Sequence, residues 1–322
     1  MRRMVRLGRR ATMTGAAGAA AAAALAWWGR GSSGDGYPHG TVSIATGLPD
    51  GVYRRYGAML QPDIENALPG VSVRLDGSRG SVENLRRVVT GRSDLTIATI
   101  DAVALLPAAD RARLRAVARL YDDYLQLVVP ADSPVASAAG LRGRRVAVGP
   151  PGSGVALAAD RLLRVAGLDP RRDVHALPYG IDEAPSMLED GAIDAFFWSG
   201  GLPTTAVTAL SRRTAVRLVP LGDLAPRLPS VYRSATMPAD SYPAVRPLAG
   251  PVATVAVPNV MAARADADPR LVERITRTVI DNRDQIGRVV HAAQLVDLRT
   301  AIYTAPLPLH EGARRYYRSV KP

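Results

Sequence analysis

The 322-residue sequence contains no cysteine, and only one of its 41 basic residues, Lys321, is a lysine. Without cysteine the chain can form no disulfide, no thiolate metal site and no lipid-modified cysteine, and it has no thiol nucleophile. Phenylalanine occurs only twice, so small aliphatic side chains must supply most of the core. Packing alone therefore has to stabilise the fold.

Metal-binding and nucleotide-binding patterns are also missing. None of the four histidines lies in a HExxH or HxH arrangement, and no GK[ST] sequence marks a phosphate-binding loop. The formal net charge is +12, but arginines and acids alternate along most of the chain, which is untypical of a nucleic-acid-binding face. We therefore expect no metal, no cofactor and no nucleic-acid partner.

Residues 1–40 are predicted to be an export signal followed by a flexible tether. A basic start precedes an Ala-rich apolar stretch, and residues 24–26, Ala-Leu-Ala, fit the small-x-small pattern of a cleavage site. The pair Arg9 and Arg10 is compatible with twin-arginine export, with the Sec route and an uncleaved N-terminal anchor as alternatives. In each case the remaining chain is expected to be extracytoplasmic.

From Thr41 onward, apolar strands alternate with amphipathic helices. The stretch GSRGSVENLRRVVTGRSDLTIATID, residues 77–101, contains a Gly/Ser loop, a helix that we expect Ser81 to cap, a stop at Gly91 and a continuous apolar strand. This order predicts a βαβ crossover, with its Gly/Ser loop at the carboxyl end of a strand. The fold class is therefore predicted to be α/β.

The same order recurs downstream, where Gly191-x-x-Asp194 repeats the spacing of Gly91-x-x-Asp94. This repetition favours two similar lobes. We expect lobe I to contain residues 41–127 plus 256–322, and lobe II to contain residues 128–255. Because the chain crosses twice between them, the crossings should form a hinge beside an interlobe cleft, where ligands bind in open α/β sheets.

Catalysis finds little support in the sequence. Gly152-Ser153-Gly154 lacks the spacing of a G-x-S-x-G nucleophile elbow, so an exported hydrolase using Ser153 is only a minor alternative. Asp122 and Asp123 are adjacent, so their side chains should point apart, and we expect a solvated turn in place of a catalytic carboxylate pair. The chain is therefore predicted not to be an enzyme.

The Gly/Ser loops at residues 77–81 and 150–154 have a physical use, since each precedes a predicted helix. A helix start offers unpaired N–H groups and a partial positive charge that can receive a carboxylate. Ser81 and Ser153 could add hydroxyl donors, although capping is their plainer role, and Arg79 could add a charge-assisted bond. Both loops are candidates for solute binding.

Several ordered stretches resemble one family. TVSIATG with GVYRRYG, GSRGSVENLRRVVTGRSDLTIATID, LRAVARLYDDYLQLVVPADS, VAVGPPGSG and GAIDAFFWSGGLPT are similar to the TAXI family, the solute-binding subunits of tripartite ATP-independent (TRAP) transporters. The resemblance covers residues 41 to about 260 and extends more loosely to the C-terminus. It implies a type II periplasmic-binding-protein fold that closes on a small solute, often a carboxylate such as glutamate or 2-oxoglutarate, and a membrane TRAP permease as partner. A binding protein that presents its closed form to a membrane sensor kinase is the alternative.

The resemblance also implies a set of ligand-binding residues. They lie in the Gly/Ser loops, at the hinge side and after the last buried strand: Thr46, Gly47, Tyr53, Ser78, Ser81, Asn84, Tyr121, Ser153, Gly154, Ser199 and Gly201. One departure from the family concerns Leu48-Pro49-Asp50, which replaces a Gly/Thr-rich run. If Asp50 faces the cleft, its carboxylate would disfavour an anionic ligand. Trp198 is expected either in the core or in the cleft lining.

Overall fold

The computed structural model describes residues 38–245, 250–288 and 296–320. The predicted signal and nearly all of the tether lie outside these ranges, so that prediction stays a prediction. Contacts group residues 38–322 into a unit of their own, and all features described here belong to it. Within the described ranges, no helix is long and apolar enough to cross a membrane.

The first half of this unit contains the predicted βαβ arrangement. Strand β1 pairs in parallel with both β2 and β3, and the connecting helices bury one face each, as their apolar spacing predicts. Two short helices then lead into a long strand. In chain order the elements are β1 (Gly40–Ala45), α2 (Val52–Ala67), β2 (Val71–Asp76), α3 (Ser81–Val89), β3 (Leu95–Thr99), α4 (Ile100–Leu105), α5 (Ala108–Ala112) and β4 (Leu114–Pro130).

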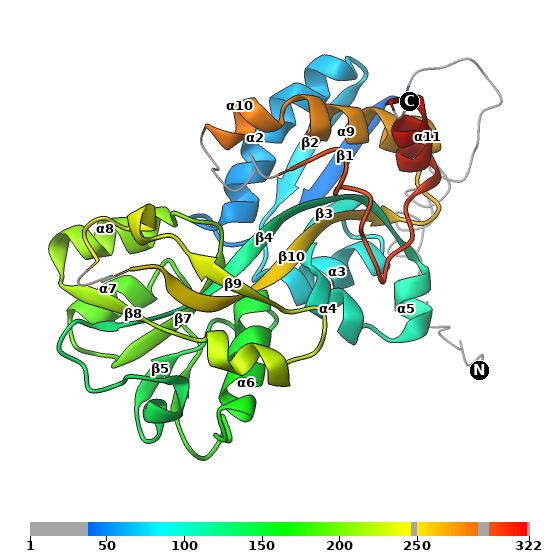
Figure 1. Ribbon diagram of the computed structural model, residues 1–322. Coiled ribbons are helices and arrows are strands. Elements are labelled where there is room, and N and C mark those ends of the chain that lie inside the picture. Colours follow the sequence, from blue (N-terminus) through cyan, green and yellow to red (C-terminus); the bar gives the residue numbers. More distant parts are fainter. Residues whose placement is uncertain (1–37, 246–249, 289–295, 321–322) are drawn as a thin grey trace, which may run out of the picture. The chain divides into compact units, whose positions relative to one another are not determined.

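The second half repeats this arrangement before the chain returns (Figure 1). Strand β5 pairs in parallel with both β6 and β7. The elements are β5 (Arg145–Ala147), α6 (Gly154–Val165), β6 (His175–Leu177), α7 (Ala184–Glu189), β7 (Ala195–Gly200), α8 (Thr205–Arg213), β8 (Val216–Val219) and β9 (Arg233–Met237). The return strand and last helices are β10 (Val252–Arg264), α9 (Pro269–Asp281), α10 (Arg283–Gly287) and α11 (Glu311–Val320).

The strands form one sheet in the order β2-β1-β3-β10-β4-β7-β5-β6, with β8 beside β4 and β9 beside β10. The long strands β4 and β10 are antiparallel to each other and lie between the two parallel groups. They are the two predicted crossings, and the α/β fold class is confirmed.

Separate hydrophobic clusters stabilise the two halves. One contains Ile44 of β1, Leu60 of α2 and Ile275 of α9, whereas another contains Val146 of β5 and Leu162 of α6. Strand β4 contributes to both clusters, so the core changes over along the strand itself. The predicted lobe boundaries at residues 127 and 255 stay a prediction.

The repeated Gly-x-x-Asp spacing forms the same junction twice. Gly91 and Gly191 have φ values of 73° and 67°, in the left-handed region that ends a helix at low cost only for glycine. Asp94 accepts a 2.8 Å hydrogen bond from the Ser43 backbone N–H of β1, and Asp194 accepts one of 2.8 Å from that of Arg145 of β5. In each half, the aspartate therefore anchors the third strand to the first.

Candidate functional site

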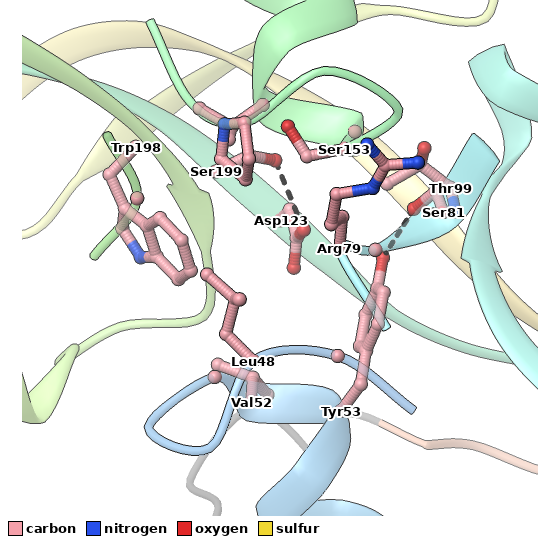
Figure 2. Close-up of a pocket in the computed structure, with 17 residues that line it drawn as sticks. Leu48, Val52, Tyr53, Arg79, Ser81, Thr99, Asp123, Ser153, Trp198 and Ser199 are labelled. Atoms are coloured by element: carbon pink, nitrogen blue, oxygen red, sulfur yellow. Dashed lines mark hydrogen bonds between the residues drawn. The ribbon is translucent and has the colours of Figure 1, made fainter. Parts of the chain in front are cut away.

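A pocket lies where loops from both halves meet at the carboxyl ends of their parallel strands (Figure 2). This is the location that ligands prefer in open α/β sheets. Its lining comes from the loop after β1 and the start of α2, the start of α3, the end of β3, β4, the β5–α6 loop, the β6–α7 loop and the end of β7. The lining residues are Gly47, Leu48, Gly51, Val52, Tyr53, Arg79, Gly80, Ser81, Thr99, Asp123, Pro150, Ser153, Gly154, Val155, Gly180, Trp198 and Ser199.

The two Gly/Ser turns, at residues 77–81 and 150–154, both line this pocket and are in contact with each other beside it. A Cβ added at Gly80 would stand 3.3 Å from the Cα of Ser153. The backbone N–H groups of Val82 and Glu83 each donate a 3.1 Å hydrogen bond to the carbonyl oxygen of Gly152. The first amides of α3, which we expected to be free for a solute carboxylate, are therefore bound to the opposite turn.

The expectation that Ser81 caps α3 was wrong. The helix begins after Gly80 without a side-chain cap, and Ser81 Oγ accepts a hydrogen bond from the backbone N–H of Thr99, at 3.1 Å. The Tyr53 hydroxyl lies 3.0 Å from Ser81 Oγ and donates to Asn259 Oδ1 at 2.5 Å. Because the Tyr53 proton is directed at Asn259, Ser81 donates to Tyr53, and this chain of bonds ties α2, α3, β3 and β10 together.

Ser153 caps α6, as its position at a helix start predicts. Its Oγ accepts a 3.0 Å hydrogen bond from the Ala156 backbone N–H, which leaves the hydroxyl proton available to a ligand acceptor. The described lining of the pocket includes no histidine that could activate this hydroxyl. The geometry therefore gives the hydrolase alternative no support.

Not all predicted ligand-binding residues reach the pocket. Gly47, Tyr53, Ser81, Ser153, Gly154 and Ser199 line it, whereas five others do not. Leu48, from the run that departs from the family, also lines the pocket, but Asp50 does not. Asp50 does not cap α2 either, because Gly51 is the N-cap residue and no side chain hydrogen-bonds to the start of the helix.

The other five predicted residues are used inside the protein. The Thr46 hydroxyl donates to a backbone carbonyl at the end of β2, and the Ser78 hydroxyl donates to Asn84 Oδ1 at 2.5 Å. Tyr121 is buried, with its ring centroid 6.0 Å from that of a neighbouring tyrosine. The carbonyl of Gly201 accepts a hydrogen bond from the Thr204 hydroxyl in the same loop. These five residues shape the loops and the hinge without lining the pocket.

Asp123 is the main residue that the sequence reasoning missed. The predicted solvated turn does not exist, because β4 continues through Asp122 and Asp123. The two side chains point apart as expected, so that Asp122 pairs with Arg119 at 2.6 Å while Asp123 is only 3% exposed and lines the pocket. The Ser199 hydroxyl donates to Asp123 Oδ2 at 3.0 Å, as Figure 2 shows.

The surroundings of Asp123 make its ionised form costly. Burial raises the pKa of this carboxyl from its usual 3.8 to about 7, although the side chains of Ser199 and Asn259 oppose the rise. Its other oxygen, Oδ1, has no hydrogen-bond partner among the described residues. The cation that lines the pocket, Arg79, is paired with Glu83 at 2.8 Å. The pocket thus holds a buried carboxyl group that forms no ion pair with any described cation.

Two further features complete the pocket. Trp198 is 8% exposed and lines the pocket, with its Nε1 donating to Thr204 at 3.0 Å. Thr99, at the end of β3, has a buried hydroxyl with no partner in the described structure. The sequence analysis did not name Thr99, although its position at the carboxyl end of a predicted buried strand could have marked it as a pocket residue. In the described ranges, no group of His, Cys, Asp or Glu side chains is suited to a metal ion.

The solved structures with a similar fold include two binding proteins and a putative transporter. The alkanesulfonate-binding protein SsuA from Xanthomonas axonopodis pv. citri, bound to MOPS, has a TM-score of 0.53 and 18% identity, covering 89% of this chain and 86% of that one. An ancestral arginine-binding protein bound to arginine has a TM-score of 0.51 and 15% identity, with coverages of 78% and 98%. A putative L-cystine ABC transporter from Listeria monocytogenes has a TM-score of 0.50 and 13% identity, with coverages of 80% and 98%.

These similarities confirm the two-lobed type II periplasmic-binding-protein fold with its hinge and interlobe cleft. They also agree with the expectation of a binding protein in place of an enzyme. The model of the family described as NMT1-like matches residues 44–320, most of the sequence. This chain belongs to the NMT1-like family.

Proposed function

We propose that this protein is an exported solute-binding protein that captures a small polar solute by closing its two lobes and delivers it to a membrane permease. The observation that carries the proposal is the pocket, which takes its lining from both halves and lies beside the contact between the turns at Gly80 and Ser153. A solute held there would touch both lobes and would favour the closed state, because its affinity for that state is higher.

The finer proposal concerns the transporter and the solute. The ordered motifs support a TRAP-type, TAXI-family subunit that acts outside the cytoplasm, with residues 1–40 as its signal or anchor. A carboxylate-bearing solute such as glutamate or 2-oxoglutarate is supported by the donors in the lining. These are the hydroxyls of Ser153 and Thr99 and the guanidinium of Arg79. We propose Gly47, Tyr53, Ser81, Ser153, Gly154 and Ser199 as lining residues that contact the solute.

A thermal-shift screen of the full chain with amino acids and carboxylates tests this function. A ligand at 100 times its dissociation constant adds about 2.7 kcal/mol to the free energy of unfolding, which gives a clear rise in the unfolding temperature. A variant that fills the pocket, Gly47→Leu, should lose this rise. A Cβ at Gly47 meets only Tyr53, at ordinary contact distances of 3.7 and 3.8 Å, so the variant should fold.

Gly77→Leu is the matched control. Gly77 is exposed and lies outside the pocket, and a Cβ there would meet only one backbone oxygen, at 4.0 Å. This variant should bind as the wild type does. A screen without any shift, or a shift that Gly47→Leu retains, would contradict the proposed function.

A further inference from the structure

We propose that the solute carries a protonated nitrogen, which binds Oδ1 of Asp123 between Trp198 and Tyr53. This inference rests on the proposed function and narrows its class of substrate. Within the carboxylates named above, it selects amino acids such as glutamate and disfavours dianions without an amine, such as 2-oxoglutarate.

The first step is the unsatisfied acceptor. Asp123 lines the pocket and one of its oxygens is bound by Ser199, while the other, Oδ1, is buried and makes no hydrogen bond of normal geometry in the described structure. The Asn259 side chain also lowers the pKa of Asp123, but its Nδ2 likewise completes no hydrogen bond of normal geometry there, so Oδ1 keeps room for a stronger donor. A buried carboxylate that accepts too few hydrogen bonds is costly, so such groups are normally paired with a donor. A donor from a solute in the pocket would satisfy Oδ1.

The second step concerns the charge of that donor. Two other acids, Asp122 and Asp101, act on Asp123, and each is already paired with an arginine of its own. Asp122 pairs with Arg119 at 2.6 Å, and Asp101 pairs with Arg161 at 3.4 Å. Both aspartates raise the pKa of Asp123, and neither of their partner cations bonds to Asp123.

Arg79, at the pocket lining, is likewise paired with Glu83, and its side chain is 55% exposed. Tyr53 and Tyr121 add only neutral hydroxyls, since burial raises the pKa of each far above its usual value. Within the part of the chain that the structure describes, acids thus surround Asp123 and no cation pairs with it, and a cationic group on the solute completes the charge balance.

The third step is the shape and chemistry of the walls. Figure 2 shows Asp123 with Trp198 to one side and Tyr53 to the other, and Leu48 and Val52 nearby. Aromatic rings attract ammonium groups through their quadrupoles, and a desolvated cation gains most from this attraction. The aliphatic side chains suit the carbon skeleton that carries the nitrogen.

Hydrogen-bond donors occupy another part of the lining. In the described structure the Thr99 hydroxyl has no partner, and the Ser153 hydroxyl keeps its proton available. Arg79 adds a guanidinium group to the same lining. A pocket that offers both a carboxyl acceptor and these donors matches a zwitterion, which carries an ammonium group and a carboxylate.

The test compares matched ligands by isothermal titration calorimetry on the full chain. Each L-amino acid, with acidic and aliphatic ones included, is paired with the 2-hydroxy acid that differs only in the nitrogen. At least one amino acid should bind, and its hydroxy acid should bind about 30-fold more weakly or worse, as expected when a buried charge loses its partner. This comparison needs no variant.

Asp123→Asn tests the residue, and Asp122→Asn is the matched control one position away. Asp123→Asn should lower the affinity for the amino acid by about 30-fold or more, while Asp122→Asn should leave it unchanged. Wild-type affinity should rise from about pH 6 to about pH 8, because the ionised carboxylate is the binding form, whereas Asp123→Asn should show no such rise.

The outcomes separate this inference from the function on which it rests. If hydroxy acids or amine-free dicarboxylates bind as tightly as amino acids, or if Asp123→Asn binds like the wild type, the inference fails and the solute-binding function stands. If no compound of either class binds the wild-type chain, both proposals fail.

Discussion

The β1-α2-β2-α3-β3 half and the β5-α6-β6-α7-β7 half share a backbone plan but differ in the side chains of their third strands. Counted from Gly91 and Gly191, strand β3 has Thr96 where β7 has Phe196. Two residues later, β3 has Ala98 where β7 has Trp198. The shared glycines and aspartates specify the fold, whereas these replacements change the packing around each third strand, and of the four residues only Trp198 lines the pocket.

The ends of these strands show the same contrast. Thr99 and Ser199 occupy matching positions, and both line the pocket. Ser199 is bound to Asp123, while the Thr99 hydroxyl has no partner in the described structure. The hydroxyls at these equivalent positions thus have different roles. The Ser199 hydroxyl of β7 binds the Asp123 carboxyl, whereas the Thr99 hydroxyl of β3 remains available to a ligand.

The largest expected effect is a loss of unfolding free energy when the packing of the third strands, β3 and β7, is changed. Phe196 is fully buried, so Phe196→Ala should lower the free energy of unfolding by about 3–5 kcal/mol through lost contacts and a cavity. Thr96→Ala should cost about 1 kcal/mol, since it removes the hydroxyl bond to the Ala45 carbonyl. Urea unfolding measures both, and equal losses would contradict the comparison.

The next effect concerns Asp123, which lies within β4, between the two halves, and whose side chain bonds to the third strand of the second half, through Ser199. Because its pKa is raised to about 7 in the folded state, the contribution of Asp123 to the free energy of unfolding is full below about pH 4, is lost as the pH rises to about 7, and then levels off. One pKa unit corresponds to about 1.4 kcal/mol, so the loss is at most about 4 kcal/mol.

Asp123→Asn should abolish this loss, and it should be more stable than the wild type at about pH 8. Urea unfolding at about pH 5 and about pH 8 measures the difference, and Asp122→Asn should keep the wild-type dependence. A wild-type stability that rises over this range, with Asp123→Asn unchanged, would mean that the carboxyl is better solvated than the pocket indicates.

The smallest expected effect is at the repeated helix ends. Gly91→Ala and Gly191→Ala should each cost about 1 kcal/mol, because both glycines have left-handed φ values. Gly91→Ala should cost more, since its Cβ would lie 2.7 Å from an Arg264 nitrogen, whereas none of the described atoms lies within 4 Å at Gly191. Gly140→Ala, at an ordinary φ, is the control, and a larger loss at Gly191 would break the comparison.

Much of the fold could be predicted from local patterns. The apolar spacing of α3, its end at Gly91 and the buried strand after it follow from helix and strand periodicity together with glycine's freedom at positive φ. Ser153 as a cap also follows from its place before a helix. The junctions at Asp94 and Asp194 were visible as a repeated spacing.

The pocket could be predicted only in part, because its contents depend on distant segments. Whether the chain turns at Asp122 and Asp123 is decided by β10, whose Pro258 and Val257 pair with them more than 130 positions along the chain. Ser81 does not cap α3 because the Thr99 amide, 18 residues away, takes its oxygen. No local pattern reports such competition for a hydrogen bond.

The two amides of α3 that bind the Gly152 carbonyl have a consequence for timing. Both bonds join backbone groups, so no side-chain substitution removes them directly, and they belong to the closed state that the solute is proposed to favour. A solute held in the pocket should leave only after these bonds open, so we expect its release rate to depend on the lifetime of two hydrogen bonds. Slow release would then be a built-in property of the turn at Gly152.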